Sequence, residues 1–233
     1  MRIFAIGDPH LSAVNPKPMN VFGGNWDNHL ERIQAAWRAS VSDEDLVLVP
    51  GDISWAMQLE DAAPDLESLG ILPGRSVIIR GNHDYWWSSL RKVRSILPSN
   101  MQAIQNDALD FGSVVVAGTR LWTSPGSQVF KTEEDEKIYR REIGRLELSL
   151  QAAKKLRRED QPLIVMLHYP PFNERTEDNE ATQLLAAYDA DIVVYGHLHD
   201  KSTRYAFEGE WNGIVYHLTS CDHLDFVPKL IWP

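Results

Sequence analysis

Five short apolar runs, each followed closely by residues that bind metals, constrain the fold of this chain more than any other feature. The runs are IFAIG, LVLV, VIIR, LIVML and DIVVY. Their length and their content of Val, Ile and Leu are typical of strands buried on both faces of a sheet. The groups that follow them are Asp8-Pro9-His10, Gly51-Asp52, Gly81-Asn82-His83-Asp84, His168 and Gly196-His197-Leu198-His199. Because ligands bind outside the carboxyl ends of strands in α/β sheets, we expect these groups to meet at one place.

Helical patterns alternate with these runs and predict an α/β fold. The expected helices cover about residues 26–39, 55–69, 88–96, 132–158 and 179–187, with Asn25 or Asp27 capping the first. The longest starts at the capping pattern Thr132-Glu133-Glu134-Asp135 and ends in a basic cluster, so its charges suit the helix dipole. Two irregular loops, residues 11–25 and 119–131, are expected to carry specificity. Two or three strands, read as antiparallel, are expected within residues 202–231.

Length and composition limit the classes of protein to consider. The 233 residues suit one domain over 1–233, because a single site would draw on motifs from both halves of the chain. With 23 basic and 33 acidic residues, net −10, we expect no basic surface for nucleic acid. No apolar stretch approaches the ~20 residues that cross a bilayer, and the first run is too short for a signal peptide. The single cysteine, Cys221, fits a reducing compartment, so we expect a soluble cytoplasmic protein.

Seven side chains in the motifs are candidate metal ligands: Asp8, His10, Asp52, Asn82, His168, His197 and His199. They offer carboxylate, amide oxygen and imidazole but no thiolate, a set that suits Mn, Fe or Zn. Seven ligands exceed one tetrahedral site but fill the shells of two divalent ions if a carboxylate, for which Asp52 is the natural candidate, bridges them. A solvent molecule between two cations loses a proton readily. Phosphoester hydrolysis by attack of a metal-bridging hydroxide is therefore the chemistry that fits best.

The ordered motifs DxH, GD, GNHD, a lone His ahead of a Pro-rich loop, and GHxH resemble those of the calcineurin-like metallophosphoesterases, and the match spans nearly the whole chain. The resemblance implies a four-layer α/β sandwich, with two mixed sheets flanked by helices and a metal site at the strand carboxyl ends. It places one metal on Asp8, His10, Asp52 and His199, and the other on Asp52, Asn82, His168 and His197. It also implies that His83 protonates the leaving oxygen.

The role of His83 is chemically reasonable, because His titrates near neutrality and can protonate an alkoxide. Asp84 either acts with His83 by orienting it or satisfies backbone amides in the turn. Where protein Ser/Thr phosphatases carry GDxxDRG, this chain has Trp55 and Ala56 in place of the acid and the arginine. This departure favours a small phosphomonoester or phosphodiester over a phosphoprotein. It also leaves the carboxylate partner of His83 open.

Side chains outside the ligand set provide further candidates. Arg120 and Arg175, in predicted loops near the strand ends, are candidate phosphate clamps. We expect core packing for at least two of Tyr85, Trp86 and Trp87, with one free to stack on a base or ring of the substrate. His217 and His223 are weaker candidates for a role behind the metal ligands.

Two other functions remain open at this point. A nuclease would use the same metals, but the acidic balance argues against extended contact with nucleic acid. A non-catalytic metal-binding scaffold of the same fold would be expected to lack some ligands, and none is missing from the motifs.

Overall fold

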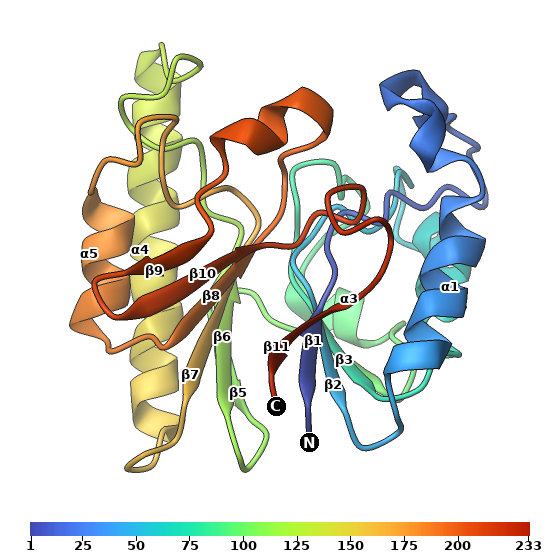
Figure 1. Ribbon diagram of the computed structural model, residues 1–233, viewed down its shortest axis with the longest axis horizontal. Coiled ribbons are helices and arrows are strands. Elements are labelled where there is room, and N and C mark those ends of the chain that lie inside the picture. The colour runs from blue at the N-terminus through green and yellow to red at the C-terminus, as the bar shows by residue number, and fades with distance from the viewer.

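A computed structural model describes residues 1–233, with the side chains of residues 22 and 24 left out of the description. Two mixed sheets pack face to face, and helices cover both outer faces (Figure 1). The predicted four-layer α/β sandwich is confirmed. No helix in the described part of the chain is both long and apolar enough to span a bilayer.

The first sheet is parallel except at one edge. In spatial order it contains β11 (Lys229–Trp232), β1 (Ile3–Ala5), β2 (Leu46–Val49), β3 (Arg75–Ile78) and β4 (Met101–Ala103). Strands β1 to β4 pair in parallel, and β11 pairs antiparallel to β1. The carboxyl ends of β1, β2 and β3 therefore open on the same edge.

The second sheet repeats this arrangement with an antiparallel strand at each edge. In spatial order it contains β5 (Ala108–Asp110), β6 (Val115–Thr119), β7 (Leu163–Leu167), β8 (Ile192–Tyr195), β10 (Ile214–Leu218) and β9 (Gly209–Trp211). Strands β6, β7, β8 and β10 pair in parallel, so the expectation of an antiparallel carboxyl-terminal region holds only for β9 and β11.

Successive side chains of a strand point to opposite faces of its sheet, and both faces are covered here, which explains why the apolar runs are unbroken. In β2, Leu46 and Leu48 face the other sheet, whereas Val47 and Val49 belong to the core beneath the helices. A strand covered on both faces needs apolar residues at every position. The core between the sheets joins β1, β2 and β3 to β6, β7 and β8, which fixes the two sheets relative to one another.

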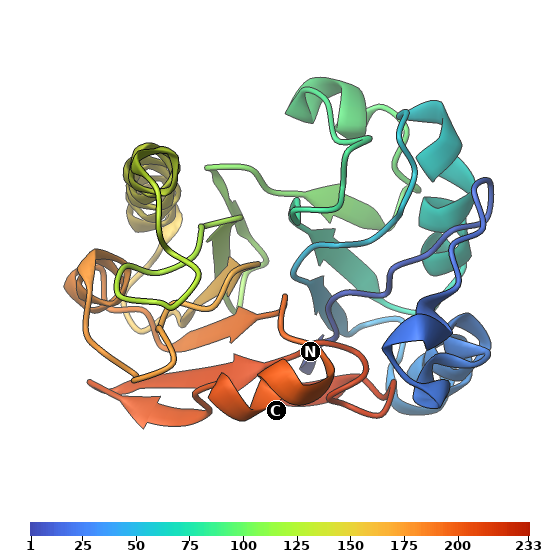
Figure 2. The ribbon, with the colours of Figure 1, turned by 90° about the horizontal axis from the view of Figure 1, so that it is seen from above.

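Three helices cover the first sheet and two cover the second (Figures 1 and 2). They are α1 (His29–Ser40), α2 (Ala63–Gly70) and α3 (Leu90–Arg94) on one side, and α4 (Glu133–Leu156) and α5 (Glu180–Ala187) on the other. The cap predicted for α4 is confirmed, because Thr132 and Asp135 form a reciprocal capping box.

Three local predictions were wrong. The cap of α1 is Asn28, in a left-handed conformation with no side-chain cap bond, rather than Asn25 or Asp27. The loop over residues 11–25 contains two short 3-10 helices, η1 (Met19–Phe22) and η2 (Gly24–Trp26), the second ending at Trp26. The helix expected from residue 55 begins later, with η3 (Glu60–Ala62) leading into α2, because Leu11 and Ser54 instead form a β-bridge.

Asp45 fastens the start of β1 to the turn ahead of β2. Its buried carboxylate accepts bonds from the Arg2 guanidinium at 2.6 Å, the Arg2 amide at 2.9 Å and the Ser42 amide at 2.9 Å. Burial works to raise the pKa of Asp45, but the bonds from Arg2 and Ser42 outweigh it and hold the pKa well below its usual range. The ionised form is therefore favoured by folding.

We predict that Asp45→Asn lowers the free energy of unfolding by about 2 kcal/mol at pH 7, since it removes charge-assisted bonds to a buried acceptor. Urea unfolding at several pH values measures the effect. Because the pKa is lowered by folding, the deficit should be fully present above the unfolded value of ~3.9 and shrink as the pH falls below it. Asp43→Asn, at an exposed position of the same turn, is the matched control. An equal loss in both variants would contradict the assignment.

Candidate metal centre

The seven predicted ligands lie together where the carboxyl ends of β1, β2, β3, β7 and β8 meet. The sequence argument assumed a single crevice, and the structure forms it between the two sheets. Two sets of three donors have ligand atoms within 4.8 Å of one another. The sets are Asp8 with His10 and His199, and Asp8 with Asp52 and His168.

Asp52 lies between the side chains assigned to the two ions. Its Oδ2 is 3.7 Å from His10 Nε2 and 3.5 Å from His168 Nε2. Asn82 completes the second side, with its Oδ1 2.6 Å from His168 Nε2 and 2.8 Å from His197 Nδ1. Asp52 is therefore close to one histidine of each ligand set that the resemblance implies.

The hydrogen bonds of two imidazoles turn their Nε2 atoms toward the cluster. His168 Nδ1 lies 3.0 Å from the carbonyl oxygen of Pro50, which can only accept, so Nε2 of this neutral ring carries a lone pair toward Asn82 Oδ1. His199 Nδ1 donates to Asp222 Oδ1 at 2.7 Å, and its Nε2 lies 3.3 Å from His10 Nε2. Acceptors that face one another are satisfied by a cation. The donor set therefore fits the metal ions that the motifs imply.

Backbone strain and close packing hold these ligands in place. Asp8, His10, Asp52 and His197 all have positive φ angles, between 47° and 73°, which non-glycine residues seldom adopt. A Cβ on Gly196 would lie 2.2 Å from Asp8 Oδ2, so only glycine lets the GHxH turn pack against this carboxylate. With Gly196 in place, the His197 amide donates to both Asp8 oxygens at 3.1 Å.

Burial sets the charge state of the ligands in the absence of a cation. It raises the pKa of Asp8 to about 8, with His199 opposing and Asp52 adding to the shift, and raises the pKa of Asp52 to about 6. Burial also lowers the pKa of His168 to about 3, which keeps its imidazole neutral. Neutral imidazoles bind metals, and a nearby cation favours ionised carboxylates.

The candidate acid His83 lies beside the cluster, and among the described residues the Asp84 carboxylate forms its hydrogen bonds with groups other than the His83 ring. The Asp84 carboxylate is buried and accepts bonds from the amides of Gly81, Ile53 and Ser54 and from the Trp86 indole. These contacts agree with the second of the two roles considered for Asp84, in which its carboxylate accepts hydrogen bonds from backbone amides of the turn. His83 Nδ1 is buried without a hydrogen-bond partner among the described residues.

Trp55, at the position of the acid in the phosphoprotein phosphatase motif, packs against two histidines of the cluster and a lysine. The Trp55 ring stacks on His10 with centroids 5.0 Å apart and lies 4.4 Å from the His83 ring. Lys17, from the loop over residues 11–25, places its Nζ 3.2 Å from the Trp55 ring centroid. The sequence did not single out Lys17, because nothing local links that loop to residue 55.

The carboxyl-terminal segment approaches the cluster through a residue that the sequence analysis missed. Asp222 holds His199, whereas His223 pairs with Glu208 and His217 lies on β10, so neither histidine is seen beside the ligands. The sequence pointed to the segment YHLTSCDH because of its two histidines, but the residue that contacts the cluster is the acid between them, Asp222. Of the two arginines predicted as clamps, Arg120 contacts Glu142, and the exposed Arg175 pairs with Glu177.

The aromatic residues after His83 divide as expected. Trp86 and Trp87 are buried in the core under the helices, whereas Tyr85 is exposed, with its ring centroid 6.1 Å from that of His83.

Two cavities open at the cluster. A cleft of about 110 Å³ is lined by His10, Asp52, His83 and their neighbours. A second cavity of about 280 Å³ reaches His197 and is lined by Tyr169, Phe172 and Tyr205 with residues of the 119–131 loop.

Facing sheets with carboxylates and imidazoles gathered at their shared edge define an α/β protein with a candidate metal site. A family model, the calcineurin-like phosphoesterases, matches residues 1–201. The chain therefore belongs to the calcineurin-like phosphoesterase family, as the motifs indicated.

Solved structures support the fold. A protein of unknown function from Aquifex aeolicus is 12% identical, with 98% of this chain and 94% of that chain covered and a TM-score of 0.50. Phosphopantetheinyl hydrolase from Mycobacterium tuberculosis is 13% identical, with 94% and 88% covered and a TM-score of 0.53. No curated protein matched the sequence.

We predict that Asp222→Asn weakens metal binding about 10- to 100-fold. The neutral amide of the variant would orient the His199 ring less firmly than the carboxylate does, and it would make His199 Nε2 a weaker base. Titration of metal into the chelator-treated chain measures the affinity. Asp225→Asn, at an exposed position of the same segment, should leave it unchanged. Equal affinities for both variants and the wild type would show that Asp222 has no part in metal binding.

Proposed function

We propose that the protein is a dinuclear metal-dependent phosphoesterase that hydrolyses a small phosphomonoester or phosphodiester. The observation that carries the proposal is the convergence of the seven candidate ligand side chains, in which Asp52 Oδ2 lies 3.7 Å from His10 Nε2 and 3.5 Å from His168 Nε2. Family membership supports the reaction class. Divalent cations held there would supply an activated water and neutralise charge on the phosphoryl oxygens.

The protein side chains have separate tasks in this reaction. Asp52 would belong to both metal shells, and Asp222 holds His199 in the tautomer that presents Nε2. His83 lines the same cleft as His10 and Asp52, within reach of a leaving group, and in protonated form would donate its proton to the departing oxygen. Asp84 positions the turn that carries His83.

The cavity beside His197 suggests which part of the substrate is recognised. Tyr169 packs against the His197 ring with centroids 4.1 Å apart, and Phe172 and Tyr205 continue the lining. Apolar rings next to a phosphoryl-binding centre favour an organic ester over inorganic polyphosphate. The structural relative named as a phosphopantetheinyl hydrolase is consistent with hydrolysis of an organic ester, although the likeness itself concerns the fold.

Further parts of the proposal rest on the sequence. We propose Mn, Fe or Zn as the metals, because the donors are carboxylate, amide and imidazole. We also propose that residues 1–233 act as one domain in the cytoplasm, where a single cysteine stays reduced. A small phosphoester is the proposed partner, and nucleic acid is disfavoured by the net charge of −10.

The chelator-treated chain should hydrolyse neither aryl phosphate monoesters nor aryl diesters, and added Mn²⁺ or Zn²⁺ should restore at least one activity. Asp52→Asn should lose ~10³-fold or more in kcat/KM, because it removes a ligand from both shells. The metal content of the purified chain, measured by mass spectrometry, should fall with it. Asp27→Asn, at an exposed position, is the control. Metal-loaded wild type without either activity would count against the enzyme and favour a scaffold.

His83→Ala should slow esters with poor leaving groups by roughly 10²–10⁴-fold, and activated nitrophenyl esters far less, because only a poor leaving group needs a proton. Metal content should remain that of the wild type. Comparing kcat/KM across a leaving-group series makes the test. Equal losses on all esters would remove the assignment of His83 as the acid.

A further inference from the structure

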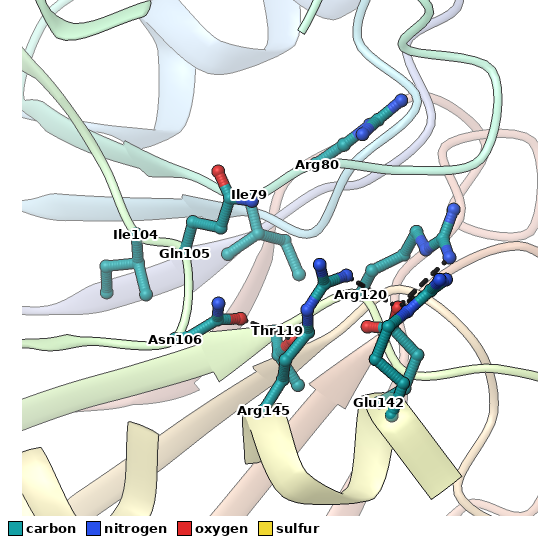
Figure 3. A pocket seen from close by; sticks show the side chains of 10 residues that line it. Ile79, Arg80, Ile104, Gln105, Asn106, Thr119, Arg120, Glu142 and Arg145 are labelled. Carbon is teal, nitrogen blue, oxygen red and sulfur yellow. Dashed lines mark hydrogen bonds and ion pairs between the residues drawn. The ribbon is translucent and has the colours of Figure 1, made fainter. Parts of the chain in front are cut away.

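A third cavity lies between the edges of the two sheets. It has a volume of about 240 Å³ and is lined by the ends of β3, β4 and β6 and by α4 (Figure 3). Four arginines contribute to the lining: Arg80, Arg120, Arg141 and Arg145. It shares no lining residue with the cleft that holds His10 and Asp52.

Glu142 organises three of these arginines. Its carboxylate is fully buried, and Oε1 accepts from Arg145 at 2.7 Å, from Arg120 at 3.2 Å and from Arg141 at 3.4 Å. A buried carboxylate requires one cation for neutrality, and here it has three. Glu142 thus holds three guanidinium groups around the cavity, and their positive charge exceeds the negative charge of its carboxylate.

Arg80 follows β3 of the other sheet and lines the same cavity. Figure 3 shows it on one side of the cavity, with Arg120, Arg145 and Glu142 on the other. Its Nε is buried and has no hydrogen-bond partner among the described residues. Glu142 pairs with three of the guanidinium groups and Asp84 acts on Arg80, so four cations face two carboxylates and positive charge is in excess here in a chain of net charge −10.

We propose that this four-arginine cavity binds a phosphoryl group, as free phosphate or as the phosphate of a small metabolite. Guanidinium forks match the oxygens of phosphate, and a doubly charged anion would neutralise most of the excess charge. The volume is below the ~300–1,000 Å³ of ordinary small-molecule pockets, which favours a compact anion. The lining donors that remain, Gln105 and Asn106, suit the same ligand.

The site is connected to the metal centre through the backbone. Arg80 directly precedes the Gly81-Asn82 turn, and the Arg120 carbonyl accepts the amides of His168 at 3.2 Å and Tyr169 at 3.0 Å. A bound anion would therefore tie together the two segments that present Asn82 and His168. Binding itself requires no metal, so the proposal stands whether or not the chain is a phosphoesterase.

Calorimetric titration of the full chain with inorganic phosphate and with glycerol 3-phosphate tests the site, in chelator and again with metal added. We expect binding to persist in chelator and to weaken at high salt. Arg80→Gln should reduce affinity about tenfold or more, while it leaves the pairs of Glu142 intact. Arg158→Gln, an equal charge change beyond the carboxyl end of α4, should leave affinity unchanged. Circular dichroism confirms that each protein is folded under the conditions of the titration.

The outcomes separate the alternatives. Stronger binding of glycerol 3-phosphate would identify a phosphorylated metabolite, and stronger binding of inorganic phosphate would identify the free ion; both support the proposal. Binding that appears only with metal would locate phosphate at the metal centre and overturn it. Equal affinities for Arg80→Gln and the wild type would also overturn it, and the arginines would then be a structural network around Glu142.

Discussion

The burial of Asp8 and Asp52 at the edge shared by the two sheets is the constraint on which the site depends. Both carboxylates are almost fully shielded from water, and they lie among four histidines and an asparagine. Burial of that kind is unfavourable unless positive charge is close by. The close approach of Gly196 and the left-handed conformations of Asp8, His10, Asp52 and His197 keep the arrangement from relaxing. A cation would resolve the conflict that the fold creates.

The rest of the architecture serves this edge. Parallel strands place their carboxyl ends on one side, and the core between the sheets fixes β1, β2 and β3 against β7 and β8. Behind the ligands, Pro50, Asp84 and Asp222 set ring orientation and turn geometry. The ligands are therefore held by elements that are themselves rigid.

Charge is distributed unevenly over this acidic chain. The metal cluster gathers carboxylates that need cations, while the cavity around Glu142 gathers guanidinium groups that need an anion. The backbone next to Asn82 and His168 links the two regions. An oxyanion in the arginine cavity and cations in the cluster would each neutralise what the fold leaves uncompensated.

The sequence by itself determined the strands and the ligands, because both are local properties. An apolar run of four or five residues is a strand core in many contexts, and β2 and β7 match LVLV and LIVML at both ends. A ligand directly after such a run must emerge at the strand end. The helix boundary near Trp55 depended instead on the bridge between Ser54 and the distant Leu11, and Asn28 caps α1 without a side-chain bond, so the local pattern misplaced both boundaries.

Only the tertiary structure decided which distant side chains meet. Apolar runs do not reveal which strands share a sheet, so the crevice between two sheets could not be derived from them. Asp222 forms a hydrogen bond with His199, 23 residues away in the sequence. Arg80 and Arg145 line the same cavity from different elements. The local sequence does not predict such pairs, because charged residues at these positions have the pattern of residues exposed to solvent. The packing of the two sheets and α4 brings these residues close together, and it places arginines from distant parts of the sequence around one cavity.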